Sequence, residues 1–307
     1  MFGLKRYNYN TFTRDLLIKA AVKTKFGSGP EPGDRAPGFE GRTLDGGKFR
    51  LSDFEGEKNV VLTFGSATCP FTAASIGGLN DLYDDYADRD VEFLFVYVRE
   101  AHPGEKLGRH QTGDDKRAAA EQFATQEKVD IPILVDELNG KIHRKYGSLP
   151  NPTYIIDKSG RVAFRSLWTR ASVLEDALDE LLKRQEERDS DHAIVRGGED
   201  TSMPIAYALF HAHRALDRGG DKAIEDFRRE LGMPGRLAHT ASRVAQPIAL
   251  YPGRAFAAAL IAGGVIVGGL LLGRKLRWQR YGSLRSPYRY QGVQPRETTE
   301  GDYAVGI

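Results

Sequence analysis

Apolar residues fall into two patterns along the chain, and together they predict strands that alternate with helices. Largely apolar runs without alternation, at Val60–Phe64 and at 91–98 (VEFLFVYV), are typical of strands covered on both faces. Between them, apolar residues recur at helical spacing from Ala74 to Tyr86. A second helical pattern covers 114–127, where two aspartates stand at the N-terminal end that favours negative charge.

The flanking segments extend this alternation. Before the first apolar run, the pattern predicts a hairpin with strands at Gly41–Leu44 and Lys48–Leu51. After 127 we expect a short strand at 131–136, a short helix at 140–147 that Gly147 closes, and a strand–turn–strand unit at 153–166. A further helix follows, opened by a capping box of Ser172 and Glu175. The predicted fold class is therefore α/β, a mixed sheet with helices on both faces.

This pattern places one domain at 34–188, after an N-terminal segment and linker at 1–33. The charged stretch 185–201 is typical of a linker. We therefore expect a linker and helical region at 189–253, with helical patterning at 204–232 but no catalytic pattern.

Two histidines in the helical region, His211 and His213, are two positions apart. They would point to different faces of a helix and make a poor metal pair. We expect no metal and no cofactor.

The N-terminal segment contains a short, basic, amphipathic helical pattern, made by Leu16, Leu17, Ala20, Ala21 and Lys23. Lys19 interrupts the apolar stretch and no small-residue cleavage site follows, so we expect no secretory signal. Three interpretations remain open: a helix docked on the main domain, a helix on a membrane surface, and a transit peptide.

Residues 255–272 (AFAAALIAGGVIVGGLLL) form a run of 18 residues without a charge. That length just reaches what a membrane-spanning helix needs, so we predict a transmembrane helix at 254–274 and a basic tail at 275–307. A buried hydrophobic helix and an interfacial element are the alternatives. Glycines at Gly-x-x-x-Gly spacing, Gly264–Gly268 and Gly269–Gly273, would suit a homodimer through this helix.

Two arguments about membrane orientation conflict. Positive residues gather after the span, which puts the tail in the cytoplasm. The lack of a signal sequence instead favours a cytoplasmic main domain. We expect a single-pass membrane protein with a cytoplasmic catalytic domain.

Composition narrows the choice of function. The chain has 307 residues, of which 40% are hydrophobic and 28% charged, with a net charge of +2. Such a weak net charge gives no field that would attract nucleic acid, and we expect no nucleic-acid partner. The chain has one cysteine, Cys69, which excludes a disulfide within the chain.

Cys69 follows the apolar run in a Gly-Ser-Ala-Thr turn and precedes Pro70. Proline favours the first turn of a helix, so Cys69 is expected at or next to the N-cap. Free N–H groups and the helix dipole there would lower the pKa of the thiol and make it reactive. A buried, inert cysteine is the alternative.

Two longer motifs resemble thioredoxin-like redoxin proteins. The first, GDRAPGFEGRTLDGGKFRLSDFEGEKNVVLTFGSATCP, starts at 33 and is similar to the opening of such proteins. The second, NPTYIIDKSGRV, starts at 151 and is similar to the later element of that superfamily. The resemblance covers roughly 34–185. It implies a thioredoxin-like fold, a catalytic cysteine at Cys69 and a cis-proline, here Pro152, that faces the active site.

A narrower resemblance is to the iodothyronine deiodinases. VVLTFGSATCPF, with Ser66, Thr68 and Pro70 around the cysteine, and VEFLFVYVREAHPGE carry it. It implies that Cys69 replaces a selenocysteine that removes iodine from an aromatic ring, and that Glu100 and His102 are its partners. The sequence departs from that family at Ala67, where an auxiliary cysteine stands, and at Arg99, where an acidic residue stands.

These observations predict a membrane-anchored, single-cysteine thiol oxidoreductase. Cys69 would attack a small-molecule or protein electrophile, an external thiol would regenerate it, and Thr72 would hydrogen-bond the thiolate or simply pack. A peroxidase with one reactive cysteine and a non-catalytic thioredoxin-fold binding module are the alternatives. His110 and His143 stand in no motif and are expected at the surface.

Overall fold

The computed structural model describes residues 7–25 and 29–250. Its centre is a six-stranded mixed sheet in the order β5-β4-β3-β6-β7-β8. β3 (Asn59–Gly65) pairs in parallel with β4 (Val91–Tyr97), which pairs in parallel with β5 (Ile133–Val135). On the other side, β3 pairs antiparallel with β6 (Thr153–Ile156), and β6 with β7 (Val162–Ser166). The predicted α/β class and mixed sheet are confirmed.

Alternate side chains of the strands build two apolar layers, because successive residues of a strand point to opposite faces. One layer packs under the long helices α3 (Pro70–Asp85), α4 (Gly113–Glu127) and α6 (Ala171–Arg188). The other is covered by lighter elements: the hairpin of β1 (Glu40–Arg42) and β2 (Lys48–Arg50), the short helix η1 (Leu51–Phe54) and α5 (Lys141–Lys145). Long helices therefore cover one face of the sheet, whereas a hairpin and short helices cover the other.

Two sequence predictions in this part of the chain are wrong. α6 begins at Ala171 and its N-cap is Arg170, so Ser172 lies inside the helix and opens no capping box. The capping box belongs to α4, where Thr112 and Asp115 satisfy each other's backbone N–H groups. Both serine and threonine fit the pattern, so the motif alone did not identify the helix that uses it.

The expected linker at 185–201 is also wrong. α6 continues to Arg188, and β8 (Glu199–Asp200) then adds a parallel edge strand to β7. Between them, Ala193 and Val195 are buried in the larger apolar layer. These two apolar residues and hydrogen bonds such as that from the N–H of Val195 to the Ala163 carbonyl hold the segment on the domain.

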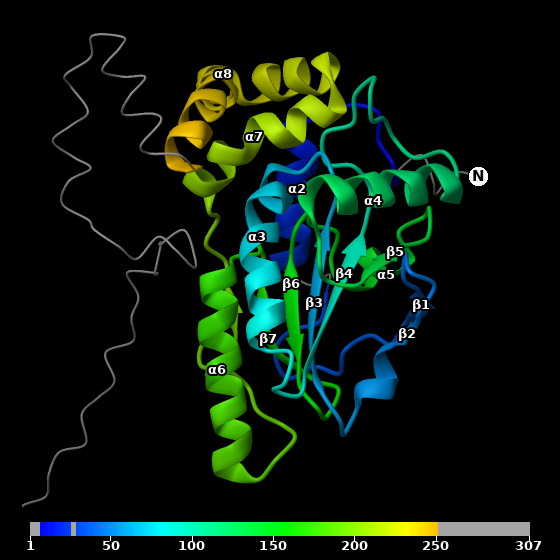
Figure 1. Cartoon of the computed structure of the whole chain (residues 1–307), viewed down its shortest axis with the longest axis vertical. Helices are drawn as coiled ribbons and strands as arrows, with labels where there is room; N and C mark the ends of the chain where they lie inside the picture. The colour runs from blue at the N-terminus through cyan, green and yellow to red at the C-terminus, as the bar shows by residue number, and fades with distance from the viewer. Residues whose placement is uncertain (1–6, 26–28, 251–307) are drawn as a thin grey trace, which may run out of the picture.

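Helices also flank the sheet at one end. α2 (Arg14–Lys25) lies near the N-terminus, and α7 (Ile205–Gly219) and α8 (Asp221–Leu250) form a pair near the other end of the described chain. Figure 1 shows α7 and α8 across the end of the sheet at which β3 and β4 finish. α2 is docked there through Leu17, Ala20 and Ala21, which pack with Phe71 and Trp168.

Among the residues that the structure describes, no helix is long and apolar enough to cross a membrane. The transmembrane helix predicted at 254–274 and the basic tail at 275–307 lie outside those residues.

Candidate functional site

Cys69 lies beyond the carboxyl end of β3, directly before α3. It is the N-cap of α3 with extended backbone angles (φ −92°, ψ 117°), and Pro70 is the first helical residue, as predicted. The Cys69 carbonyl accepts from the N–H of Ala73 at 3.0 Å, while its own N–H donates to the Ser66 carbonyl at 3.2 Å. The cysteine is thus held at both ends of a tight turn.

Gly65 makes this turn sterically feasible. A Cβ at this position would lie 2.5 Å from the ring of Phe95 and 2.7 Å from the hydroxyl of Thr72. Any larger residue would push Thr72 away from the turn, so the Phe-Gly-Ser sequence has a packing reason here.

The thiol of Cys69 is buried, with 1% of the residue exposed. Burial raises its pKa above the ordinary value of 9.0, although the N–H groups of Phe71 and Thr72 and the Thr72 hydroxyl favour the thiolate. The expectation of a lowered pKa is therefore wrong for this closed conformation. The helix N-terminus acts as predicted, but loss of water around the sulfur outweighs it.

Thr72 occupies the place at which a dithiol motif carries its second cysteine. Besides its effect on the thiol, its hydroxyl accepts from the N–H of Ser66 and from Nδ2 of Asn151, both at 3.4 Å. Thr72 therefore connects the cysteine turn to the segment that precedes β6.

Glu100 is the centre of a buried hydrogen-bond network behind the cysteine turn. Its carboxylate accepts from the N–H and the hydroxyl of Thr68, at 3.0 and 2.7 Å, and from the Tyr97 hydroxyl. Nε2 of His110 lies 3.1 Å from the same carboxylate. Burial alone would raise the pKa of Glu100, but the bonds from His110, Tyr97 and Thr68 bring it below its ordinary value.

This geometry refines the role expected for Glu100. Its hydrogen bonds go to the residue before Cys69 and not to the sulfur, so it orients the turn as a carboxylate. Ser66 joins the same framework, since its hydroxyl accepts from the N–H of Ala101 at 3.2 Å.

His110 and His143 are both buried, so the prediction that they lie at the surface is wrong. His110 pairs with Glu100. His143 donates through Nε2 to the Leu149 carbonyl at 2.6 Å and accepts from the Tyr7 hydroxyl at 2.8 Å. Neither residue stands in a local motif, and tertiary contacts alone bring them inside.

His102 lies beside the same cavity as Cys69. Its ring is held between those of Phe12 and Phe227, with centroid distances of 4.2 and 5.4 Å. Burial lowers its pKa to about 3, against the nearby carboxylates of Asp226 and Glu100, and its Nδ1 is buried without a hydrogen-bond partner. The imidazole is therefore neutral near pH 7, which excludes the ion pair with Cys69 in this conformation.

The cavity beside Cys69 has a volume of about 40 Å³. It has room for a few water molecules but not for an aromatic ring. Three parts of the chain enclose it: the N-terminal segment, the start of α3, and the residues that follow β4. Its lining includes Tyr9, Phe12, Leu16, Leu17, Phe71, Arg99, Ala101 and Pro150.

The sequence did not identify several of these walls. Tyr9 and Phe12 belong to a segment set aside as a linker region, and no spacing ties them to Cys69. For Arg99, the available signal that it lies at the site was its position next to Glu100.

Pro152 is placed differently from the expected active-site proline. No peptide bond in the described ranges is cis. Pro152 is buried, and its carbonyl accepts from the N–H of Phe64 at 3.1 Å, which aligns β6 with β3. Pro150, two residues earlier, is the proline that lines the cavity.

The N-terminal wall is fastened by polar contacts. The Asn8 side chain donates to the Leu138 carbonyl at 2.7 Å, and the Tyr9 hydroxyl donates to the Ala101 carbonyl at 2.9 Å. Arg99 binds the Tyr7 carbonyl at 3.0 Å, and Lys222 of α8 reaches the Asn10 carbonyl at 2.8 Å. The segment before α2 is thus a fixed wall, whereas α2 itself is held mainly by apolar packing.

The helices α7 and α8 pack against the loop that follows β4, although their sequence shows no catalytic pattern. A Cβ on Gly104 would overlap the Gly219 carbonyl oxygen, so the loop and the helix junction touch. The Glu105 carboxylate accepts from the N–H groups of Asp221 and Lys222, at 2.6 and 2.9 Å, and caps α8. The helical pair is therefore joined to the loop that carries His102.

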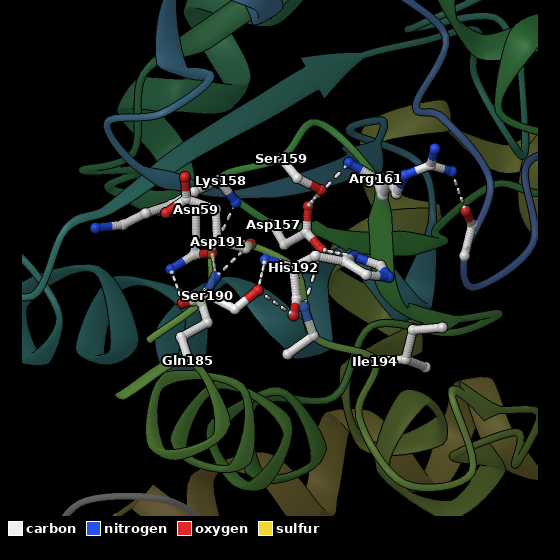
Figure 2. Close-up of polar contacts among 12 residues, drawn as sticks. Asn59, Asp157, Lys158, Ser159, Arg161, Gln185, Ser190, Asp191, His192 and Ile194 are labelled. Atoms are coloured by element: carbon white, nitrogen blue, oxygen red, sulfur yellow. Dashed lines mark hydrogen bonds and ion pairs between the residues drawn. The ribbon is translucent and has the colours of Figure 1, made fainter. Parts of the chain in front are cut away.

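The opposite end of the sheet also carries a histidine–carboxylate pair. Figure 2 shows His192 and Ser159 converging on the carboxylate of Asp157, at 2.7 and 2.6 Å. Asn59 and Gln185 exchange two side-chain hydrogen bonds of 2.9 Å nearby. These contacts join the turn after β6 to the C-terminal end of α6. In the described part of the chain, no group of three metal-ligating side chains occurs at either end.

The part of the chain that carries Cys69 is similar to known proteins. Residues 32–165 match the model of the AhpC/TSA family. The thiol-disulfide oxidoreductase ResA of Bacillus thuringiensis is 29% identical over 155 residues, which cover 50% of this chain and 78% of that protein. The thyroxine 5-deiodinase of Gallus gallus is 31% identical over 147 residues, covering 44% of this chain and 56% of the deiodinase.

A solved structure gives a weaker likeness. The putative thiol:disulfide interchange protein DsbE of Chlorobium tepidum has a TM-score of 0.41 and 23% identity, covering 50% of this chain and 99% of that one. The sequence matches show that residues 32–165 are similar to the AhpC/TSA family, and that the chain is similar both to thiol-disulfide oxidoreductases and to iodothyronine deiodinases.

Proposed function

We propose that the protein is a thiol oxidoreductase of redoxin or deiodinase-like type that works with one cysteine. The observation that carries this is the position of Cys69, the only cysteine of the chain, at the N-terminus of α3 with Thr72 in the place of a second thiol. Because the chain offers no resolving cysteine, an external small-molecule or protein thiol must complete the cycle.

The chemistry balances for the electrophiles that such a sulfur attacks. With a disulfide, the Cys69 thiolate displaces one thiolate and forms a mixed disulfide, which an external thiol then opens. With a peroxide, the sulfur accepts one oxygen, an alcohol or water leaves, and two external thiols reduce the sulfenic acid with release of water. With a carbon-bound iodine, the sulfur takes the iodine to form a sulfenyl iodide and the carbon takes a proton. Two external thiols then reduce the sulfenyl iodide, form a disulfide and release iodide and a proton.

The closed conformation is a resting state in this proposal. Burial raises the pKa of the Cys69 thiol and lowers that of His102 to about 3, so both groups are uncharged. Movement of a cavity wall would admit substrate and water together and remove the cost of charging both groups. His102 then serves as the base that takes the thiol proton.

A peroxidase is the second candidate. The cavity of about 40 Å³ suits a small electrophile without any wall movement, and Ser66 has the hydroxyl position of the Ser-x-x-Cys pattern. Leu62 stands where that pattern has proline. Rapid mixing with hydrogen peroxide distinguishes the candidates: reaction no faster than that of free cysteine excludes peroxidase action.

Membrane attachment forms part of the proposal. The uncharged run 255–272 follows α8, which ends at Leu250, and its length supports a single-pass anchor. The same span would carry a homodimer contact, and the catalytic domain would lie in the cytoplasm.

Replacement of the sulfur tests the function. Cys69→Ser removes the nucleophile while keeping nearly the same volume, and we expect it to abolish thiol-dependent turnover of disulfide, peroxide and iodinated phenol substrates. The assay follows oxidation of a dithiol reductant, with unfolding measured in parallel to show that the variant is folded. Turnover in the serine variant at the rate of the wild type would overturn the proposal, whereas a wild-type protein without any thiol-dependent turnover would favour the non-catalytic binding module.

A further inference from the structure

The turn that carries Cys69 is held from two sides. From the segment after β4, Glu100 accepts both the N–H and the hydroxyl of Thr68. From α7, the guanidinium of Arg218 donates through Nη1 to the Ala67 carbonyl at 3.0 Å. These contacts reach the two residues directly before the cysteine.

Arg218 is itself firmly placed. Its Nη2 group pairs with the Glu127 carboxylate, and its Nε donates to Oε1 of Gln126 at 2.9 Å. The Arg218 side chain is 14% exposed and that of Glu127 is 1% exposed. A planar guanidinium makes all three contacts at once, which a lysine ammonium on its flexible stem does not reproduce.

Arg218 lies well outside the part of the chain that matches the redoxin family, which ends at 165. The helical pair that supplies it packs against the site at a second point, where Phe227 contacts the ring of His102. A segment without catalytic motifs therefore reaches both the cysteine turn and its neighbouring histidine.

We propose that Arg218 is a positioning residue for Cys69: it fixes the Ala67 carbonyl and so holds the sulfur against the N-terminus of α3. The inference rests on the proposed function for its meaning in catalysis, but its effect on the thiol is independent of any substrate. Without this contact, the Ala67 carbonyl loses its bond to α7, while Thr68 keeps its bonds to Glu100 and Ser66 its bond to Thr72. Small displacements of a reacting group cost large factors in rate, because aligned attack depends on position.

Arg214 provides a matched control. It lies one helical turn before Arg218 and pairs with the same Glu127 carboxylate, and its hydrogen bonds go to Glu127 and His211 rather than to the cysteine turn. Arg214→Gln therefore removes an ion pair from Glu127 and leaves the contact with Ala67. A purely structural role of the arginine–glutamate cluster predicts equal effects for the two sites.

The experiment measures alkylation of Cys69 by iodoacetamide against pH in the full chain, together with kcat and KM for thiol-dependent turnover. Tyr9, Arg99, His102 and Glu100 surround the thiol and are unchanged in every variant. Arg218→Gln should move the alkylation midpoint to higher pH, because the sulfur loses its alignment with the N–H groups of Phe71 and Thr72. It should also lower kcat by about tenfold or more with little change in KM.

Arg218→Lys keeps the charge and is the variant to use if Arg218→Gln does not fold. Its alkylation midpoint and kcat should resemble those of the glutamine variant, because the bond to Ala67 and the pair with Glu127 both need the planar guanidinium. Arg214→Gln should keep the wild-type alkylation profile. An unchanged or lowered midpoint in both Arg218 variants, or an equal shift in Arg214→Gln, overturns the proposal. If no substrate turns over, the proposed function fails while the alkylation result still decides the role of Arg218.

Discussion

The two ends of the central sheet each hold a histidine against a buried carboxylate, but they use the pair differently. At the carboxyl end of β4, the side chains of His110 and Glu100 are 2% and 0% exposed, and the pair lies behind a reactive turn. At the opposite end, His192 is 44% exposed and only Asp157 is buried, with Ser159 and two backbone N–H groups as its other partners (Figure 2).

The surroundings explain the difference. Asp157 accepts hydrogen bonds from donors in a turn and in the segment after α6, and these contacts stay within that group of residues. Glu100 instead directs its bonds toward Thr68, next to Cys69, while His102 keeps an unpartnered Nδ1 beside a cavity. A buried polar atom without a partner carries a cost in stability, and the one on His102 lies beside the cavity that Cys69 lines. The pair alone does not mark a functional site, whereas its connection to a nucleophile and an unsatisfied neighbour does.

The sharpest test of this comparison removes one carboxylate at a time. Glu100→Ala leaves His110 and the N–H of Thr68 buried without their acceptor, so we expect a loss of about 3–5 kcal/mol in the free energy of unfolding, with a large fall in turnover. Asp157→Ala should cost about 1–3 kcal/mol, because its partners regain water more easily, and should leave turnover unchanged. Urea denaturation and the dithiol assay measure both effects. A fall in turnover for Asp157→Ala as large as that for Glu100→Ala would break the distinction.

A second effect, about 1.4 kcal/mol for each pH unit, concerns acid stability at the Cys69 edge. Burial lowers the pKa of His102 from 6.5 to about 3, so below pH 6.5 the unfolded chain binds a proton that the folded chain does not. This group therefore makes stability decline as the pH falls from about 6.5 toward 3, by about 1.4 kcal/mol per pH unit. His102→Gln should flatten the slope by that one proton in unfolding measured at several pH values. An unchanged slope would show that His102 is protonated in the folded protein.

The smallest expected effect concerns access to the sulfur. Leu17 packs α2 onto the cavity, whereas its neighbour Ile18 is 51% exposed. Loss of about 1 kcal/mol of packing in Leu17→Ala would raise the open population, and hence the alkylation rate of Cys69, about fivefold. Ile18→Ala is the control and should leave the rate unchanged. Equal rates in all three proteins would mean that α2 is not the wall that moves.

Local patterns predicted much of the fold. Apolar runs marked β3 and β4, and the position of Pro70 after Cys69 placed the cysteine at the start of α3. These features depend on neighbours in the sequence, which periodicity and helix-capping preferences report directly.

The remaining features depend on contacts between distant parts of the chain. Nothing near His110 indicates that it pairs with Glu100, and nothing near Arg218 indicates that it binds the Ala67 carbonyl. The raised pKa of Cys69 has the same origin, because the N-terminal segment and the surrounding loops exclude water from a helix terminus that would otherwise lower it. Spacing in the sequence shows which titratable groups are available, whereas burial in the fold determines whether they are charged.

The mass of the intact protein tests most directly whether Cys69 is the one reacting atom of a catalyst. Since the chain has one cysteine, any adduct formed with a disulfide such as oxidised glutathione is assigned without ambiguity. We predict a single adduct on the wild-type protein that an external thiol removes at a rate matching turnover, and no adduct on Cys69→Ser. An adduct on the serine variant, or a wild-type adduct that thiol does not remove, would contradict the account.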